Sequence, residues 1–123
     1  MSKITLSKLP HTWIFDLDGT ILKHNSFKTD DEILPGVKNF FDQIDLNDKI
    51  VFITAREEAV RKQTENTLRK NNIRWDKILF NFPVGERIVL NDIKPLGLKT
   101  AIAINLERDK GLVDYEIFID EEI

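Results

Sequence analysis

The chain has 123 residues, of which 41% are hydrophobic and 32% charged, with a formal net charge of -3 and no cysteine. This length and composition predict one globular domain, residues 1–123, and exclude a disordered or fibrous protein. The lack of cysteine excludes disulfides, thiolate metal sites and cysteine nucleophiles, and the acidic balance argues against a nucleic-acid partner.

No apolar run in the sequence has the length of a signal peptide core or a membrane span. We therefore expect a cytoplasmic protein without a membrane partner. Short apolar runs alternate with longer amphipathic stretches, which is typical of an α/β domain. Five of the runs are continuous and predict parallel strands buried on both faces. They are residues 13–15, 50–53, 78–80, 88–90 and 101–104.

Two helices are predicted between these strands. Pro35 suits the first turn of a helix whose apolar side chains share one face, namely Val37, Phe40, Phe41 and Ile44. Residues 57–71 predict a second, largely solvent-facing helix with an acidic start and a basic end. The run at 113–119 is expected to be an edge strand or an interface element. The fold prediction is a three-layer, Rossmann-like α/β fold around a mainly parallel five-stranded sheet.

Polar residues follow the predicted strands where a ligand site is expected, because the carboxyl ends of parallel strands share one edge of the sheet. Asp16 and Asp18 follow the first strand, Thr54 follows the second, and Asn91 with Asp92 follow the fourth. Asp16 and Asp18 alternate along the chain, so both carboxylates address one volume while Leu17 turns into the core. Crowded carboxylates favour a shared hard cation such as Mg²⁺.

Each of these signals has a plain structural alternative. Asp16-Leu17-Asp18-Gly19 is equally consistent with a strand followed by a turn. Thr54 alone is more often a helix cap, and Asp92 alone is more often the start of a turn. Only their conjunction favours a site.

The same residues resemble the motifs of the haloacid dehalogenase superfamily of phosphohydrolases. Residues 15–20 (Phe-Asp-Leu-Asp-Gly-Thr) resemble its first motif, residues 52–56 (Phe-Ile-Thr-Ala-Arg) its second, and Asn91-Asp92 its fourth. The likeness covers about residues 11 to 106. Residues 90–112 are also similar to small bacterial members found in surface-polysaccharide gene clusters.

The resemblance implies a role for each matching residue. Asp16 is the nucleophile that forms an aspartyl-phosphate, and Asp18 is the general acid and base. Mg²⁺ is held by Asp16, Asp18 through its backbone carbonyl, and Asp92. The implied phosphoryl contacts are the hydroxyl of Thr54 and backbone N–H groups near Leu17 and Gly19.

Two motif positions depart from the family pattern. Asn91 stands where relatives often have a second acid. The third motif is a cation, for which Arg87 is the first choice and Lys94 the second, although either is also consistent with a solvated surface charge. Arg56 is a further substrate-binding candidate, and the alternative is an ion pair with Glu57 or Glu58.

About fourteen residues separate Thr20 from Pro35, too few for a cap domain with its own core. The resemblance then implies an open site that accepts bulky substrates or is closed by a neighbouring subunit of a homo-oligomer. The predicted function is a Mg²⁺-dependent phosphomonoesterase acting on a small phosphorylated metabolite, a sugar or sugar derivative. The alternatives are a nucleic-acid 3′-end phosphatase and a non-catalytic phospholigand-binding relative.

Overall fold

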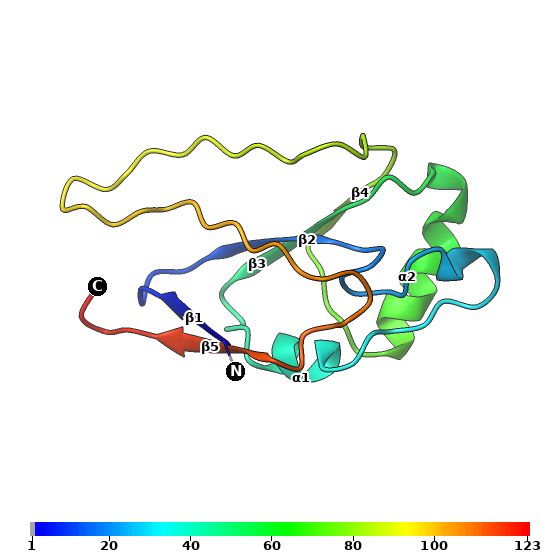
Figure 1. Ribbon diagram of the computed structural model, residues 1–123, viewed down its shortest axis with the longest axis horizontal. Helices are drawn as coiled ribbons and strands as arrows, with labels where there is room; N and C mark the ends of the chain where they lie inside the picture. Colours follow the sequence, from blue (N-terminus) through cyan, green and yellow to red (C-terminus); the bar gives the residue numbers. More distant parts are fainter. Residues whose placement is uncertain (1) are drawn as a thin grey trace.

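Three parallel strands form the larger sheet of the computed structural model, which describes residues 2–123 (Figure 1). The strands β2 (Thr12–Asp16), β3 (Lys49–Ile53) and β4 (Lys77–Leu79) lie in that order. Asp16 is in register with Ile53, and Ile53 with Leu79, so the three strands end at a common edge. The α/β class and the first three predicted strands are confirmed.

A second sheet pairs the two ends of the chain. β1 (Ser2–Leu6) runs parallel to β5 (Tyr115–Ile119), with Ser2 opposite Tyr115 and Leu6 opposite Ile119. The run at 113–119 therefore contains a strand, as expected, whereas β1 was not predicted. Its alternating burial, with Ile4 and Leu6 inward, ties it to the common core.

The predicted five-stranded central sheet is wrong. Residues 88–90 and 101–104 form no strand, and the chain from 83 to 105 instead makes a long two-limbed excursion, here called the arm (Figure 1). Backbone-to-backbone hydrogen bonds within the arm are confined to its tip, where Lys94 N–H donates to Leu98 and Gly97 N–H to Lys94. Without a paired neighbour, an extended apolar run does not form a ladder.

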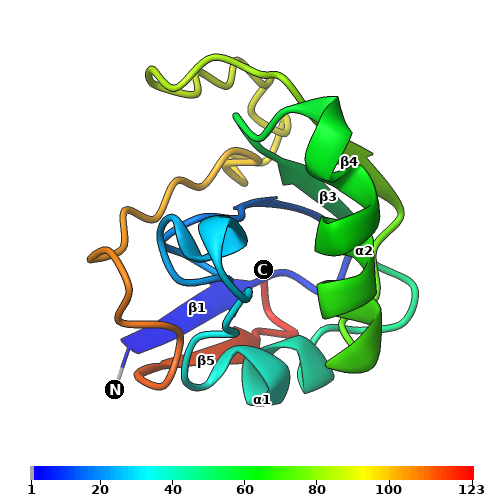
Figure 2. The same ribbon diagram turned by 90° about the vertical axis from the view of Figure 1, so that its right-hand side faces the viewer.

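The helices cover one side of the larger sheet. α1 (Val37–Asp42) and α2 (Arg61–Lys70) are preceded by the 3₁₀ turns η1 (Ser26–Lys28) and η2 (Glu58–Val60) respectively. Figure 2 shows both α-helices on one side of β2, β3 and β4, with the arm on the other side. Both predicted helices are present, but α1 is shorter than predicted: Pro35 lies before its N-cap Gly36, and Ile44 lies beyond its end. The segment between Thr20 and Pro35 contains the short turn η1.

An aromatic cluster joins α1 to the sheet. Phe40 and Phe41 of α1 pack against Phe15 of β2, and Phe41 stacks on Phe52 of β3 at 6.0 Å between ring centroids. Burying aromatic rings of this size stabilises each contact by about 0.5–1.5 kcal/mol beyond the area effect. The helix-facing side of the sheet is therefore the rigid platform on which the strand ends are fixed.

A polar contact anchors β2 at its amino-terminal end. Asp48, just before β3, accepts hydrogen bonds from the backbone N–H of His11 at 2.9 Å and from Trp13 Nε1 at 3.0 Å, and its other contact is with His11 Nδ1. This cluster fixes the start of β2 against β3.

Among residues 2–123, no helix combines the length and apolar character needed to cross a bilayer.

Candidate functional site

The first motif forms a tight turn directly after β2. The N–H groups of Thr20, Ile21 and Leu22 all point to the carbonyl of Leu17, and Gly19 N–H donates to Leu22 at 2.7 Å. Gly19 has a φ of +86°, and a Cβ there would lie 3.2 Å from Arg108 Cγ. This conformation strongly favours glycine. Leu17 is fully buried, as the sequence predicts, while the Gly19 N–H is already occupied by Leu22.

Asp16 belongs to the face of the sheet that the helices leave uncovered. It is in register with Ile53, and two residues earlier Ile14 pairs with Val51 on the same face. Because side chains alternate along a strand, this face is opposite the one that carries Phe15 and Phe52. The Asp16 side chain is 41% exposed and therefore accessible to a ligand.

Thr54 closes the end of β3 next to Asp16. It is 1% exposed, its N–H donates to the Leu79 carbonyl, and its Oγ1 accepts the N–H of Arg56 at 3.0 Å. That last contact is the local turn expected of a threonine that follows a strand. The structure therefore brings Thr54 to the strand-end edge with its hydroxyl engaged in positioning Arg56.

Of the two cations considered for the third motif, Arg87 is the one that reaches Asp16. Its Nη1 donates to Asp16 Oδ1 at 3.3 Å and its Nη2 to the carbonyl of Ile53 at 3.4 Å. Lys94 lies on the exposed tip of the arm, where its backbone N–H bonds to Leu98. A guanidinium beside Asp16 supplies positive charge where a phosphoryl group would need it.

Arg56 has a different environment from either one predicted for it. The residue is 5% exposed, and its guanidinium donates to Asp18 (2.9–3.3 Å), to Asp31 (2.8 and 3.0 Å) and to Thr64 Oγ1 (2.8 Å). Glu58 instead pairs with Arg61. The expectation of a substrate contact or a pair with Glu57 or Glu58 is corrected: all guanidinium nitrogens of Arg56 are bound within the protein.

Asp31, which lies beside Arg56 at the candidate site, was not predicted from the sequence. Its side chain is fully buried and bonds to Arg56, Ser26 Oγ and Gln63 Nε2. Burial by itself raises the pKa of Asp31, but the hydrogen bonds from Arg56 and Ser26 outweigh it and leave the pKa below its ordinary value. In sequence, Asp30-Asp31-Glu32 has the pattern of a solvated acidic run, so no local signal marks the buried member.

This pKa predicts an acid-sensitive stability. The pKa of Asp31 is lower in the folded than in the unfolded chain. Its contribution to the free energy of unfolding is therefore complete above the unfolded pKa of about 3.9. It is lost as the pH falls through the folded pKa. We expect urea unfolding to show a free energy of unfolding that falls below about pH 4. The Asp31→Asn variant should show a shallower fall, and Asp30→Asn, at an exposed neighbour, should keep the wild-type slope. Equal slopes in all three proteins would contradict this assignment.

The fourth-motif residues lie outside this group. Asp92 is exposed on the arm, where its carbonyl accepts a hydrogen bond from Thr100 Oγ1, and Asn91 Nδ2 donates to the same Thr100 Oγ1 at 2.9 Å. The expectation that Asp92 joins the strand-end edge is corrected, because residues 88–90 form no strand beside β2.

The fit to Mg²⁺ can be tested on these positions. Mg²⁺ prefers oxygen ligands in near-octahedral geometry. Asp16 and Asp18 supply two carboxylates, each also in contact with an arginine. In the described part of the chain, no three or more His, Cys, Asp or Glu residues gather in an arrangement suited to a metal ion. One chain in this conformation thus does not assemble the predicted three-aspartate set.

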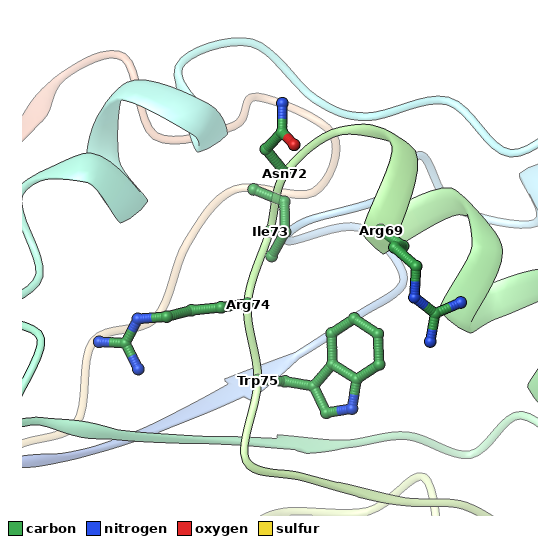
Figure 3. Close-up of a pocket in the computed structure, with 5 residues that line it drawn as sticks. All are labelled: Arg69, Asn72, Ile73, Arg74 and Trp75. Atoms are coloured by element: carbon green, nitrogen blue, oxygen red, sulfur yellow. The ribbon is translucent and has the colours of Figure 1, made fainter.

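A shallow hollow lies elsewhere on the protein, between the end of α2 and the start of β4 (Figure 3). The guanidinium of Arg69 lies 5.5 Å from the ring centroid of Trp75, and Arg74 points away from both (Figure 3). Arg74 donates instead to the carbonyls of Asp45 and Asp48. This hollow is near the amino-terminal ends of the strands, whereas Asp16 and Thr54 lie at their carboxyl ends.

No protein-family model, curated protein or solved structure matches this chain. The case for a function therefore depends on the residues and their geometry.

Proposed function

We propose that this protein is a Mg²⁺-dependent phosphomonoesterase of the haloacid dehalogenase type, acting on a phosphorylated sugar or sugar-derived metabolite. One observation carries the proposal: the accessible carboxylate of Asp16 at the end of β2 has a guanidinium, that of Arg87, within 3.3 Å. The first motif continues to Asp18, which Arg56 holds. The similarity of residues 90–112 to small bacterial relatives favours surface-polysaccharide assembly as the setting.

The chemistry divides into two displacements. In the first, a carboxylate oxygen of Asp16 attacks phosphorus, the ester P–O bond breaks, and Asp18 gives its proton to the leaving oxygen. In the second, Asp18 takes a proton from water, and the resulting hydroxide displaces Asp16 and releases inorganic phosphate. Positive charge near the phosphoryl oxygens lowers the barrier of both steps. Bound Mg²⁺ would add to that charge, and Asp16 and Asp18 are the residues at this edge that would hold it.

Arg56 and Arg87 have separate parts in this proposal. Arg87 is about one-third exposed and reaches Asp16 from the arm, so it can meet the phosphoryl group. Arg56 is buried and acts through Asp18, whose carboxylate it holds in a two-pronged contact. It is therefore a positioning residue rather than a substrate ligand.

The direct test is phosphate release in the presence of Mg²⁺ from a panel of sugar phosphates, nucleotides and 3′-phosphorylated oligonucleotides. We expect turnover of one or more sugar phosphates that is abolished by chelation of the metal. Turnover confined to oligonucleotides, with a steep salt dependence, would replace the proposed substrate class. Binding of Mg²⁺ and beryllium fluoride without release of phosphate from any ester would replace the enzyme with a phospholigand-binding protein.

A further inference from the structure

Residues 21–34, here called the η1 loop, fold back on themselves directly after the first motif. A backbone hydrogen bond of 2.9 Å from Leu34 N–H to the Ile21 carbonyl joins the two ends of the loop. The loop is too short for a core of its own, but it returns Asp31 to the neighbourhood of Asp18. A single guanidinium, bound to both, lies between these two carboxylates.

That guanidinium belongs to Arg56, and all of its N–H donors are used. Nε and Nη2 donate to Asp18 at 2.9–3.3 Å. Nη1 and Nη2 donate to Asp31 at 3.0 and 2.8 Å, and Nη1 also donates to Thr64 Oγ1 at 2.8 Å. Because the five N–H donors of an arginine lie in one rigid plane, the groups bound along one edge determine how the other edge faces Asp18.

The carboxylate of Asp31 is held as firmly as the guanidinium. Its Oδ1 accepts from Ser26 Oγ at 2.9 Å and from Arg56, and its Oδ2 accepts from Gln63 Nε2 at 3.2 Å and from Arg56. The Gln63 amide, on α2, also donates to the carbonyl of Phe27, whose ring centroid lies 5.4 Å from Arg56 Cζ. The η1 loop and α2 therefore fix Asp31 in one orientation.

This cluster is better suited to fixing geometry than to adding stability. Taking charges out of water has a desolvation cost that their mutual attraction barely offsets, and apolar side chains of similar size often stabilise a fold equally well. The cluster also holds two carboxylates for one guanidinium. Asp31 is fully buried, whereas the side chain of Asp18 is 22% exposed. Asp18 is thus the member of the cluster that a ligand can reach.

We propose that Asp31 is a positioning residue of the phosphatase site: it orients Arg56, and Arg56 in turn holds the carboxyl group of Asp18 in place for its part in the reaction. The η1 loop is then a working part of the site. The effect on catalysis rests on the proposed function, whereas the orientation of Arg56 by Asp31 rests on the hydrogen bonds alone. Because Asp31 is buried and contacts no substrate, it should affect kcat rather than KM.

The first test measures, by NMR, the exchange of the Arg56 Nε–H proton with water in the folded protein. This donor faces Asp18 and not Asp31. In Asp31→Asn, either orientation of the amide places its NH₂ group against an N–H of Arg56, and two donors cannot bond. We expect the Nε–H exchange to be about tenfold faster or more in this variant. Unchanged exchange would overturn the proposal.

Asp48→Asn is the matched control for this measurement. Asp48 is 3% exposed and accepts hydrogen bonds from His11 N–H and Trp13 Nε1 at the amino-terminal end of β2. The control therefore removes the charge of another buried carboxylate, away from Arg56. It should leave the Arg56 Nε–H exchange at the wild-type rate. Equal acceleration in both variants would show a general loosening of the fold and would contradict the specific role of Asp31.

The second test separates kcat from KM with the preferred phosphoester and Mg²⁺. We expect Asp31→Asn to lower kcat by about 10²-fold, with KM within about twofold of the wild-type value, because a displaced group slows the reaction without weakening substrate binding. Asp48→Asn should keep the wild-type kcat. A rise in KM at constant kcat would overturn the positioning role.

Ser26→Ala keeps the test decisive if Asp31→Asn does not fold. This change removes one donor to Asp31 and keeps its charge and its contact with Arg56. We expect smaller effects in the same direction, about threefold on both the Nε–H exchange and kcat. Wild-type values of both would overturn the proposal.

The two readouts distinguish this inference from the proposed function. Faster Nε–H exchange in Asp31→Asn, together with no phosphate release by the wild type, would support the orientation of Arg56 by Asp31 and contradict only the proposed function. Phosphate release by the wild type with an equal kcat in Asp31→Asn would support the function and overturn the positioning role.

Discussion

Phosphate release by the Asp16→Asn variant is expected to fall by about 10⁴-fold or more, because removing the nucleophile of a covalent mechanism removes the step that forms the intermediate. The amide keeps the shape of the side chain and can still accept a hydrogen bond from Arg87, which lies 3.3 Å away in the wild type. It is a much weaker nucleophile than the carboxylate. The measurement is the steady-state rate with the preferred phosphoester and Mg²⁺.

The fold of this variant should be unchanged. Asp16 is only partly buried and lies at the end of β2, so we expect a circular dichroism spectrum and a melting temperature close to those of the wild type. Asp114→Asn, at an exposed position before β5, is the matched control and should keep full activity. A folded Asp16→Asn protein with near-wild-type turnover would exclude Asp16 as the nucleophile.

Arg56→Met is expected to produce the largest loss of stability of any single change in the site, about 3–5 kcal/mol. The substitution leaves Asp31, whose side chain is fully buried, without the cation that compensates its charge, and it also removes the donor to Thr64. An unpaired buried carboxylate carries a large desolvation penalty. The measurement is the free energy of unfolding in urea, or the melting temperature if the variant is too unstable for a full transition.

The matched control is Arg61→Met. Arg61 lies at the start of α2 and pairs with Glu58 and Glu65 at the surface, where water screens the charges, so we expect a much smaller loss of stability than for Arg56→Met. We also expect Arg56→Met/Asp31→Asn to be less destabilised than the sum of the two single changes, because the uncompensated charge is then gone. Additive losses would show that Arg56 and Asp31 do not interact energetically.

Local patterns in the sequence predicted the helices and strands whose side-chain periodicity is regular. The helical spacing of Val37, Phe40 and Phe41 gives α1 its buried face, and the continuous apolar runs before Asp16 and Thr54 become β2 and β3. In each case the periodicity of the side chains matches the periodicity of the element. The turn after β2 is likewise local, since Gly19 alone supplies the positive φ that it needs.

The same reasoning gave wrong strands at 88–90 and 101–104. A continuous apolar run indicates that both faces of a segment are suited to burial. It does not indicate which other segment of the chain would pair with it. Strand pairing is a non-local property, and the partner of these runs is not supplied by the rest of the chain in this conformation. The arm therefore has the composition of strands without their hydrogen bonds.

The buried ion cluster shows a second limit of the same kind. Arg56 is the last residue of the second motif, but its partners Asp18, Asp31 and Thr64 come from three other parts of the chain. Nothing local separates Asp31 from its exposed neighbours Asp30 and Glu32. Only packing of the η1 loop against α2 removes one of these three carboxylates from water.

By itself, the sequence determined the α/β class and the parallel strands that end at Asp16 and Thr54. These features depend on side-chain periodicity and on the common direction of parallel strands, both of which can be recognised in short segments. The tertiary structure decided that Arg87 rather than Lys94 contacts Asp16, that Arg56 is buried between Asp18 and Asp31, and that Asp92 is exposed on the arm. Those outcomes depend on which distant segments meet, and local chemistry does not encode that choice.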